Sequence, residues 1–272
     1  MKIEDFMTEL YNFTDNAPDK YKKSCDTLKA GNPDIEFNGK VATAMFPTLS
    51  VVNEAKAWGA NLLIVHEPTY YDHWDSIKTL EEQSGFKRKI LDLKRAFLEK
   101  SEVVIYRYHD HPHYAAEDLI ALGEVARFGL KGRWINSEEI GCSEFELAEP
   151  MNVRDIAKTL EKNLDIAHVR ICGCNDFMVK RIGLNFGTPG NVEAKMSHCE
   201  LILTGEIVEW IHAEFARDAT ALGFPRAIIV MGHTCSEREG MRLLAELIPQ
   251  KFSGIEAKYF ESGDAYTFTD QF

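Results

Sequence analysis

The chain has 272 residues, of which 45% are hydrophobic and 27% charged, a composition ordinary for a globular protein. This length allows one large domain or two modest ones, each with a hydrophobic core. The net charge of −12 argues against binding to nucleic acid or to an anionic membrane surface, and it is compatible with attracting cations.

The first thirteen residues, MKIEDFMTELYNF, predict an amphipathic helix. They have neither the cationic start nor the apolar centre of a signal peptide, and no apolar run reaches the ~18 residues of a membrane-spanning helix. We therefore expect a cytoplasmic protein whose cysteines are reduced thiols. Cys172 and Cys174 form a CxC pair on a predicted strand, which is either two small buried residues or a soft-metal pair.

Short runs rich in Val, Ile and Leu alternate with longer amphipathic stretches along the chain. The runs read as buried strands: LLIV (62–65), VVIY (103–106), LILT (201–204) and AIIV (227–230). A helix-like segment precedes each run. Alternation of this kind predicts an α/β fold.

Two stretches of the sequence resemble each other at a constant offset of 139 residues. The segments 41–67 and 180–206 align without a gap, so that LLIV falls on LILT and Glu67 falls on Glu206. Both read as strand, tight turn, helix and strand. We expect the two segments to share one strand–helix–strand topology, as an internal duplication would produce.

A second pair of segments aligns at an offset of 124 and places His109 on His233 and His113 on Glu237. Together the two pairs predict two similar α/β lobes, 1–135 and 136–272, with an approximate boundary that allows the lobes to interleave. The polar stretch 131–152 is the expected connection.

Histidines and carboxylates follow three of the predicted strands. They are His66 and Glu67 after the first, His109, Asp110, His111 and His113 after the second, and His233 and Glu237 after the last. Ligands gather beyond the carboxyl ends of strands in open α/β sheets, where loops converge. Imidazole and carboxylate together suit a transition metal such as Zn, Mn, Fe or Ni.

The alternative for the stretch HDHPH is an exposed polar loop in which Pro112 marks a turn. The histidines and carboxylates expected at the other strand ends favour a metal site over this exposed loop. Glu206, at the position equivalent to Glu67, is a candidate general base facing the same cleft, and a histidine that binds no metal is the alternative base. The remaining histidines are less informative: we expect a loop position for His73, structural roles for His168 and His198, and a helix position for His212.

Four motifs in order resemble the Nif-three-like dinuclear metal-centre proteins, which are often labelled GTP cyclohydrolase I type 2. They are GANLLIVHEP, VVIYRYHDHPH, CELILTGEI and AIIVMGHTCSEREGM, and they span residues 50 to 250. The resemblance implies two similar α/β lobes with the metals lying between them, and a toroidal homohexamer.

The resemblance also implies the metal ligands, which fall on His66, Glu67, His113, His233 and Glu237, with His109 at a further motif histidine. Two positions depart from the family pattern. Glu67 replaces a second histidine, and His113 replaces an aspartate that bridges two ions. A centre with one ion, or with a different metal, is therefore an alternative to a dinuclear one.

These observations predict a metal-dependent hydrolase that acts on a small molecule, such as a nucleotide, through water activated by one or two divalent ions. The alternative is a non-catalytic metal-binding or regulatory assembly. A site that keeps an open coordination position favours the hydrolase, and a site closed by protein ligands favours the alternative.

Overall fold

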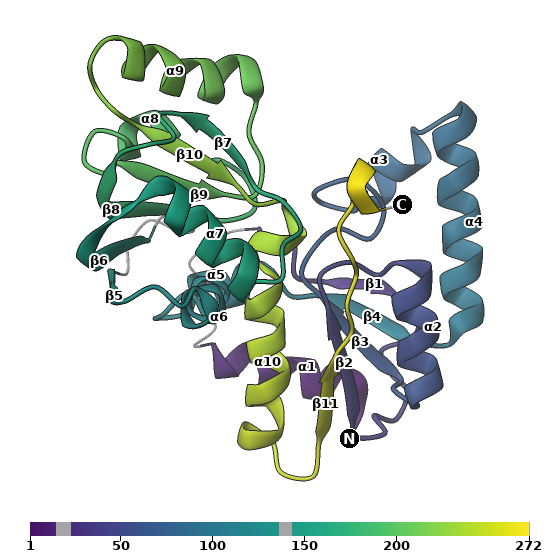
Figure 1. Cartoon of the computed structure of the whole chain (residues 1–272). Coiled ribbons are helices and arrows are strands. Elements are labelled where there is room, and N and C mark those ends of the chain that lie inside the picture. The colour runs from purple at the N-terminus through teal and green to yellow at the C-terminus, as the bar shows by residue number, and fades with distance from the viewer. Residues whose placement is uncertain (15–22, 136–142, 272) are drawn as a thin grey trace. The chain divides into compact units, whose positions relative to one another are not determined.

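The protein is described by a computed structural model that covers residues 1–14, 23–135 and 143–271 (Figure 1). The chain forms two compact units. Unit 1 comprises Met1–Leu119 and Met241–Ser262, and unit 2 comprises Ile120–Gly240 and Gly263–Phe272. The expected boundary at residue 135 therefore falls inside unit 2, and the units interleave because the chain returns to unit 1 after residue 240.

Unit 1 is built on a five-stranded sheet of order β1-β4-β3-β2-β11. The strands are β1 (Leu28–Ala30), β2 (Lys40–Ala44), β3 (Leu62–Val65), β4 (Val104–Arg107) and β11 (Glu256–Tyr259). The last four are parallel to one another, and β1 is antiparallel to β4. Strands β3 and β4 are buried along their whole length, as expected for parallel strands covered on both faces.

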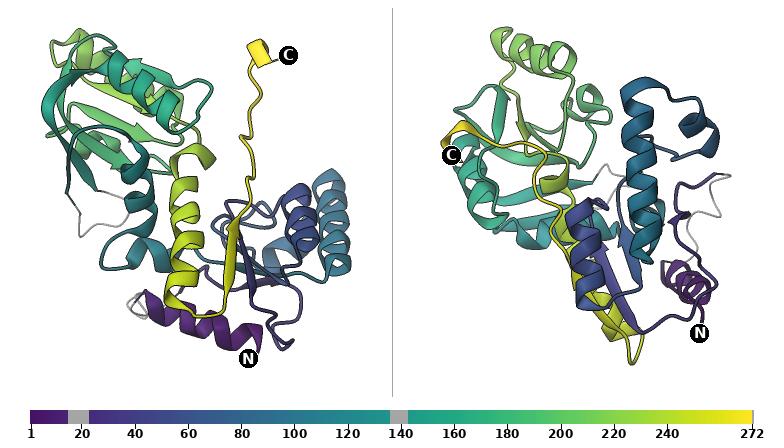
Figure 2. Two further views of the ribbon diagram at one scale, coloured as in Figure 1. Left: turned by 60° about the horizontal axis from the view of Figure 1, so that its bottom comes forward. Right: turned by 90° about the vertical axis from the view of Figure 1, so that its right-hand side faces the viewer.

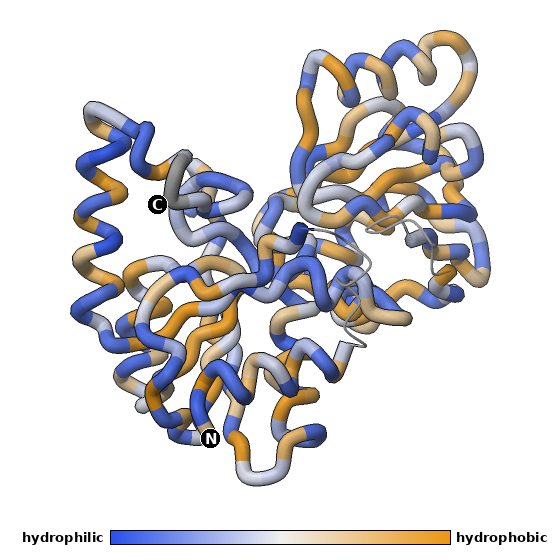
Figure 3. Tube along the Cα trace, turned by 180° about the vertical axis from the view of Figure 1, so that it is seen from behind, coloured by the Kyte–Doolittle hydropathy of each residue, from blue (hydrophilic) through white to orange (hydrophobic). Residues whose placement is uncertain are grey.

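The helices of unit 1 are α1 (Ile3–Phe13), α2 (Leu49–Trp58), α3 (Ile77–Glu81), α4 (Gly85–Ser101), the short α5 (Asp110–Tyr114), and most of α10 (Arg238–Lys251). Helices α2 and α4 cover one face of the sheet and enclose a core with β2, β3 and β4 (Figure 2). Along α4, hydrophilic and hydrophobic residues alternate in Figure 3, as expected for a helix with one buried face.

Unit 2 is built on a six-stranded mixed sheet of order β5-β6-β8-β9-β10-β7. The strands are β5 (Gly132–Ile135), β6 (Glu144–Asn152), β7 (Arg170–Gly173), β8 (Met178–Asn185), β9 (Leu201–Thr204) and β10 (Ala227–Val230). Strands β8, β9 and β10 are parallel, and the other three pair antiparallel.

The helices of unit 2 are α6 (Leu119–Arg127), α7 (Val153–Asn163), α8 (Val192–Lys195), η2 (Glu209–Ala213), α9 (Glu214–Ala221), η3 (Thr234–Ser236) and η4 (Thr269–Gln271). Helix α7 packs in the core on one face of the sheet, and α8 and α9 pack in the core on the other. None of the helices in the described ranges is long and apolar enough to cross a membrane.

The first strand–helix–strand crossover between parallel strands is β2-α2-β3 in unit 1 and β8-α8-β9 in unit 2. Each unit has a second one, β3-α4-β4 and β9-α9-β10. The predicted α/β class and the shared topology are thereby confirmed. The pairing registers differ, because Val41 pairs with Leu62 whereas Ile182, not Lys180, pairs with Leu201. The crossover in unit 2 is thus two residues shorter than the ungapped alignment requires, and α8 has only 4 residues against 10 in α2.

The second predicted equivalence is shifted by one residue in the structure. The amide of Tyr108 donates to Val65, and the amide of Met231 donates to Thr204, so Tyr108 and Met231 hold equivalent places. His109 therefore corresponds to Gly232 in the strand pairing and not to His233. The sequence alignment matched histidine to histidine by side-chain type, whereas the pairing register of the strands is determined by backbone hydrogen bonds.

Candidate metal centre

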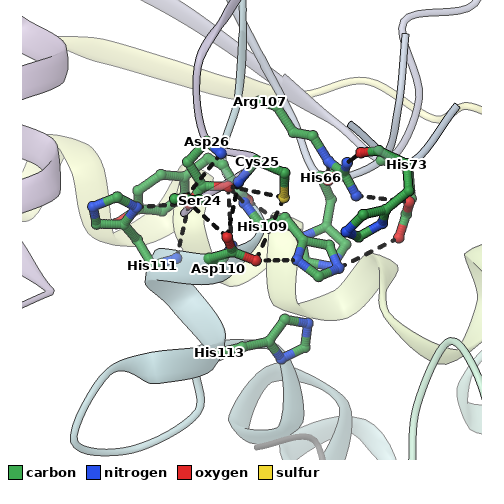
Figure 4. A network of polar contacts seen from close by, with 12 residues as sticks. Ser24, Cys25, Asp26, His66, His73, Arg107, His109, Asp110, His111 and His113 are labelled. Atoms are coloured by element: carbon green, nitrogen blue, oxygen red, sulfur yellow. Dashed lines mark hydrogen bonds and ion pairs between the residues drawn. The ribbon is translucent and has the colours of Figure 1, made fainter. Parts of the chain in front are cut away.

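Three histidines gather at the carboxyl edge of the unit 1 sheet. His66 directly follows β3, His109 follows β4, and His113 lies one turn later on α5. Neighbouring parallel strands end at the same edge, so their following residues come together there. Figure 4 shows the rings of His66, His109 and His113 as neighbours.

The three imidazole rings lie close enough to share one ion. Their centroids are separated by 4.6 Å for His66 and His109, 5.1 Å for His66 and His113, and 5.0 Å for His109 and His113. One ring nitrogen from each lies within 4.8 Å of the other two. Three imidazoles in this arrangement are a ligand set typical of a zinc-like ion.

Each of the three rings is held by an oxygen atom at Nδ1. The Nδ1 of His66 lies 3.3 Å from the carbonyl oxygen of Tyr108, that of His109 lies 3.0 Å from Asp110 Oδ1, and that of His113 lies 3.0 Å from Asp118 Oδ2. Such acceptors favour the tautomer with its proton on Nδ1, which leaves the lone pair on Nε2. Metal-binding histidines characteristically have a partner of this kind.

His66 is fully buried, and its surroundings keep it neutral. Burial lowers its pKa well below the ordinary value, and the neighbouring His109 and His113 lower it further. A neutral imidazole keeps the lone pair that a metal ion needs. Burial and tautomer thus both prepare His66 to act as a ligand.

Arg107 connects several parts of the centre. Its guanidinium is fully buried; Nε donates to the carbonyl oxygen of His66 at 2.9 Å, and a terminal nitrogen lies 3.3 Å from Glu67 Oε2. Another terminal nitrogen donates to the carbonyl oxygen of His73. The other carboxylate oxygen of Glu67 lies 3.9 Å from Nε2 of His109, which places this carboxylate at the edge of the histidine cluster.

The remaining residues of HDHPH have other partners. Asp110 accepts from His109, and His111 turns away from the cluster toward Asp26 (Figure 4). His73 lies in the loop after β3, and its ring centroid is 6.2 Å from that of His109. The exposed-loop alternative therefore does not describe HDHPH, because Asp110 and His111 are buried and His113 is mostly so.

Unit 2 brings together a second set of predicted residues, at the carboxyl edge of its own sheet. The Nδ1 of His233 lies 2.8 Å from Glu206 Oε1, and its Nε2 lies 3.3 Å from Glu237 Oε2. Glu237 is almost fully buried, whereas the Glu206 side chain is 57% exposed. Glu206 thus contacts the histidine on the side opposite Glu237, in the place of an orienting carboxylate.

Glycines allow the loops around this second set to pack closely. A Cβ on Gly187, whose φ is 62°, would lie 2.5 Å from Glu237 Oε1. A Cβ on Gly205 would lie 2.5 Å from the carbonyl oxygen of Gly187 and 2.6 Å from Ser236 Oγ. The loops after β8, β9 and β10 are therefore in backbone contact.

The other predicted positions have structural partners. His168 pairs with Asp270, and Nδ1 of His212 accepts from the amide of Val208 at the start of η2. His198 lies 2.6 Å from Glu144 and near Cys199, but Arg181 already contacts the second oxygen of that carboxylate at 2.7 Å.

The cysteines of the described ranges are all free thiols, with Cys172 and Cys174 both half-buried. Cys142 lies outside the described residues. Burial raises the pKa of the Cys172 thiol, which disfavours the thiolate that a soft metal would bind. The CxC pair thus matches the simpler expectation of two small residues at a strand.

Three important residues were not predicted from the sequence. Arg107 lies within a strand, Asp26 lies in a polar stretch near the start, and Asp118 precedes α6. Asp26 and Arg107 meet partners more than thirty residues away in the chain. Asp118 lies only five residues from His113, and this spacing was the one signal available.

The comparisons with known proteins agree with the fold and the motifs. The model of Duf34/NIF3 (NGG1p interacting factor 3) matches residues 1–264. The chain is 27% identical over 271 residues to a GTP cyclohydrolase 1 type 2 homolog of Pyrococcus abyssi (strain GE5 / Orsay), covering 96% of this chain and 97% of that protein. A protein of the same name from Clostridium perfringens (strain 13 / Type A) is 25% identical over 260 residues, covering 92% of each.

Solved structures show the same fold at lower identity. Hypothetical protein SA1388 of Staphylococcus aureus has a TM-score of 0.73 at 21% identity, covering 98% of this chain and 99% of that one. A Bacillus cereus protein related to NIF3 has a TM-score of 0.71 at 15% identity, with the same coverage.

Proposed function

The chain belongs to the Duf34/NIF3 family, and from this premise we propose that it is a metal-dependent hydrolase acting on a small molecule. Two relatives carry the name GTP cyclohydrolase 1 type 2 homolog, so nucleotides are the first substrate class to test. The observation that carries the proposal is the cluster of His66, His109 and His113, each held by an oxygen at Nδ1.

The proposed ligands are these three histidines and Glu67 in unit 1, and His233 and Glu237 in unit 2. The ions are one or two divalent transition metals, with Zn, Fe, Mn and Ni as candidates. When bound, such an ion polarises the bond under attack and makes water more acidic at neutral pH. Three imidazoles leave room for a further ligand, which is the pattern of catalytic sites.

The protein's own groups have distinct parts in this proposal. Asp110 and Asp118 fix the rings of His109 and His113, and burial keeps His66 neutral. Arg107 holds the Glu67 carboxylate beside the cluster. Glu206 orients His233 in unit 2. We also propose Glu206 as the general base, a role that its exposure to solvent supports.

The direct test is elemental analysis of untagged protein together with an assay of nucleotide hydrolysis, before and after removal of metal by a chelator. His66→Ala should lose the metal of unit 1 and all metal-dependent hydrolysis. His198→Ala is the matched control, since its ring pairs with Glu144 in another part of the fold, and it should keep both. Metal content unchanged in His66→Ala would contradict the proposal.

The same assay separates the hydrolase from its alternative. Metal bound at His66 with no hydrolysis of any nucleotide or related phosphate ester would favour a non-catalytic metal-binding or regulatory protein. Loss of hydrolysis on chelation and its return on adding back one metal would favour the enzyme. The metal that restores activity at the lowest concentration would identify the working ion.

We also propose that the protein acts as a homohexamer in the cytoplasm. The family resemblance supports the hexamer, and exposed apolar side chains in unit 2 support an association surface; they include Trp210, Leu222 and Phe224. Native mass measurement should give six chains per particle. A monomer at micromolar concentration would contradict this part of the proposal.

A further inference from the structure

Asp26 lies in the segment before β1, 83 residues before the histidine loop, yet its side chain is fully buried against that loop. Its Oδ1 accepts from the amides of His109 and Asp110 at 2.7 and 3.0 Å. Its Oδ2 accepts from the amide of His111 at 2.8 Å. One carboxylate thus receives three successive amides at the start of α5, where backbone donors have no partner within the helix.

His111 completes the contact with Asp26. Its Nδ1 lies 2.6 Å from Asp26 Oδ2, and its ring stacks on Tyr11 at 4.2 Å and near Tyr108 at 5.6 Å. This middle histidine of HDHPH therefore faces away from His66, as Figure 4 shows. The loop is held by its middle histidine, while His109 and His113 turn the other way.

Asp110, from the histidine loop, in turn accepts hydrogen bonds from the segment that carries Asp26. Its Oδ2 accepts from the amide of Cys25 at 2.9 Å and from the hydroxyl of Ser24 at 2.8 Å, and its Oδ1 accepts from His109. Burial alone would raise the pKa of Asp110, but the hydrogen bonds from His109, Cys25 and Ser24 hold it below the usual value. Asp26 and Asp110 thus form a reciprocal clamp between residues 24–26 and 109–111.

We propose that Asp26 is a positioning residue for the metal centre. It fixes the backbone of His109 and the axis of α5, and through them the directions in which the rings of His109 and His113 point. This inference rests on the proposed function, because positioning matters only if those rings bind an ion. Partners behind metal ligands typically change metal affinity by about 10- to 100-fold when removed.

The test compares Asp26→Asn with wild type in a Zn²⁺ competition titration and in the absorption spectrum of the Co²⁺ form. Asparagine keeps the shape but turns N–H groups toward backbone donors, so the loop should shift. We expect Zn²⁺ binding weaker by about 10-fold or more, and an altered Co²⁺ spectrum. The matched control is Glu200→Gln, whose carboxylate in unit 2 accepts the amides of Lys180 and Arg181 without touching a histidine. It should change neither.

A second variant and a metal-free measurement complete the test. His111→Phe keeps the stacking but removes one bond to Asp26, and it should weaken Zn²⁺ binding by a few-fold; this variant decides the question if Asp26→Asn does not fold. In protein without metal, ¹⁵N spectra of the histidine rings should show that Asp26→Asn alters the tautomer of His109.

The outcomes separate the two ideas. If wild type binds Zn²⁺ and Asp26→Asn binds it equally well with an unchanged Co²⁺ spectrum, the positioning role is overturned and the metal centre stands. If wild type binds no metal, the proposed function fails. In that case an unchanged His109 tautomer in the variant overturns the positioning of the ring as well, whereas a changed tautomer still supports it.

Discussion

Glu67 and His113 are the residues at which this chain departs from the motifs it resembles. In the structure His113 has a carboxylate partner at Nδ1, which suits a terminal ligand better than a bridge between two ions. Glu67 supplies negative charge beside His109 from the neighbouring loop. We interpret the two departures as one exchange, in which a carboxylate has moved from the α5 position to the β3 position.

This interpretation predicts the behaviour of a double variant. Glu67→His removes a charge and leaves the buried Arg107 without its carboxylate, whereas His113→Asp places a carboxylate beside Asp118. Each single change should weaken Zn²⁺ binding, and the combination should bind more tightly than either, because total ligand charge is restored. Simple additivity of the two losses in a double-mutant cycle would show that the residues are independent.

The meeting of His66, His109 and His113 could be predicted because parallel strands end at a common edge, so polar residues after LLIV and VVIY had to come together there. Asp26 could not be predicted in the same way. Nothing in the pattern around it is periodic or repeated, and its partners lie 83 to 85 residues away. The strand-end pattern alone did not separate the three histidines of HDHPH. The family resemblance favoured His109 and His113 and left the role of His111 open, and the contact with Asp26 now accounts for His111.

At the scale of elements, the start of α10 depends on a buried carboxyl group from α6. Glu124 is fully buried, and its Oε1 accepts from the amide of Glu239 at 2.9 Å. Burial raises its pKa well above the ordinary value; the hydrogen bond from the Glu239 amide lowers the pKa in part, and the Glu239 carboxylate raises it. The folded protein therefore retains this proton to a higher pH than the unfolded chain does.

The consequence is a testable dependence of stability on pH. The contribution of Glu124 is fully present below the unfolded-state pKa of 4.5 and is lost as pH rises through the folded-state value. Glu124→Gln keeps an acceptor for the Glu239 amide and cannot ionise. In metal-free protein it should match wild type near pH 4.5 and exceed it by about 1 kcal/mol or more at pH 8. Chemical denaturation at the two pH values measures this, and an equal difference at both would contradict it.

Individual strands were predictable, whereas their register was not. LLIV, LILT and AIIV coincide with β3, β9 and β10, because short apolar β-branched runs favour buried strands. The strand β11, EAKY, is half exposed and carries no such run, so it escaped prediction. The β8-α8-β9 crossover is two residues shorter than the β2-α2-β3 crossover, and its helix α8 is short. An alignment without gaps cannot show such a difference in length.

At the scale of the whole molecule, the sequence predicted that residues 136–272 form the second lobe, whereas Met241–Ser262 belong to unit 1. Strand β11 pairs with β2, and Phe260 just after it is buried in the core shared by α2 and α4. The segment after residue 262 belongs again to unit 2, where Phe268 contacts His168. Two aromatic residues only eight positions apart thus serve different units.

Phe260→Ala and Phe268→Ala test this division as a matched pair. Phe260→Ala should lower the free energy of unfolding of unit 1 by about 3–5 kcal/mol, the usual cost of emptying a core position. Hydrogen exchange should then accelerate in β2 and β3 and stay unchanged in β9. Phe268→Ala should have a much smaller effect, confined to unit 2. Equal acceleration in both sheets from Phe260→Ala would contradict the division of the chain.

The proposed function depends on His66, His109 and His113 holding a metal ion together. The most direct measurement is an anomalous difference map, recorded at the zinc edge, from crystals of untagged protein grown with Zn²⁺. We expect a peak about 2.0–2.1 Å from Nε2 of each of the three histidines. Peaks found only elsewhere, for example between His198 and Glu144, with none at these three rings, would contradict it.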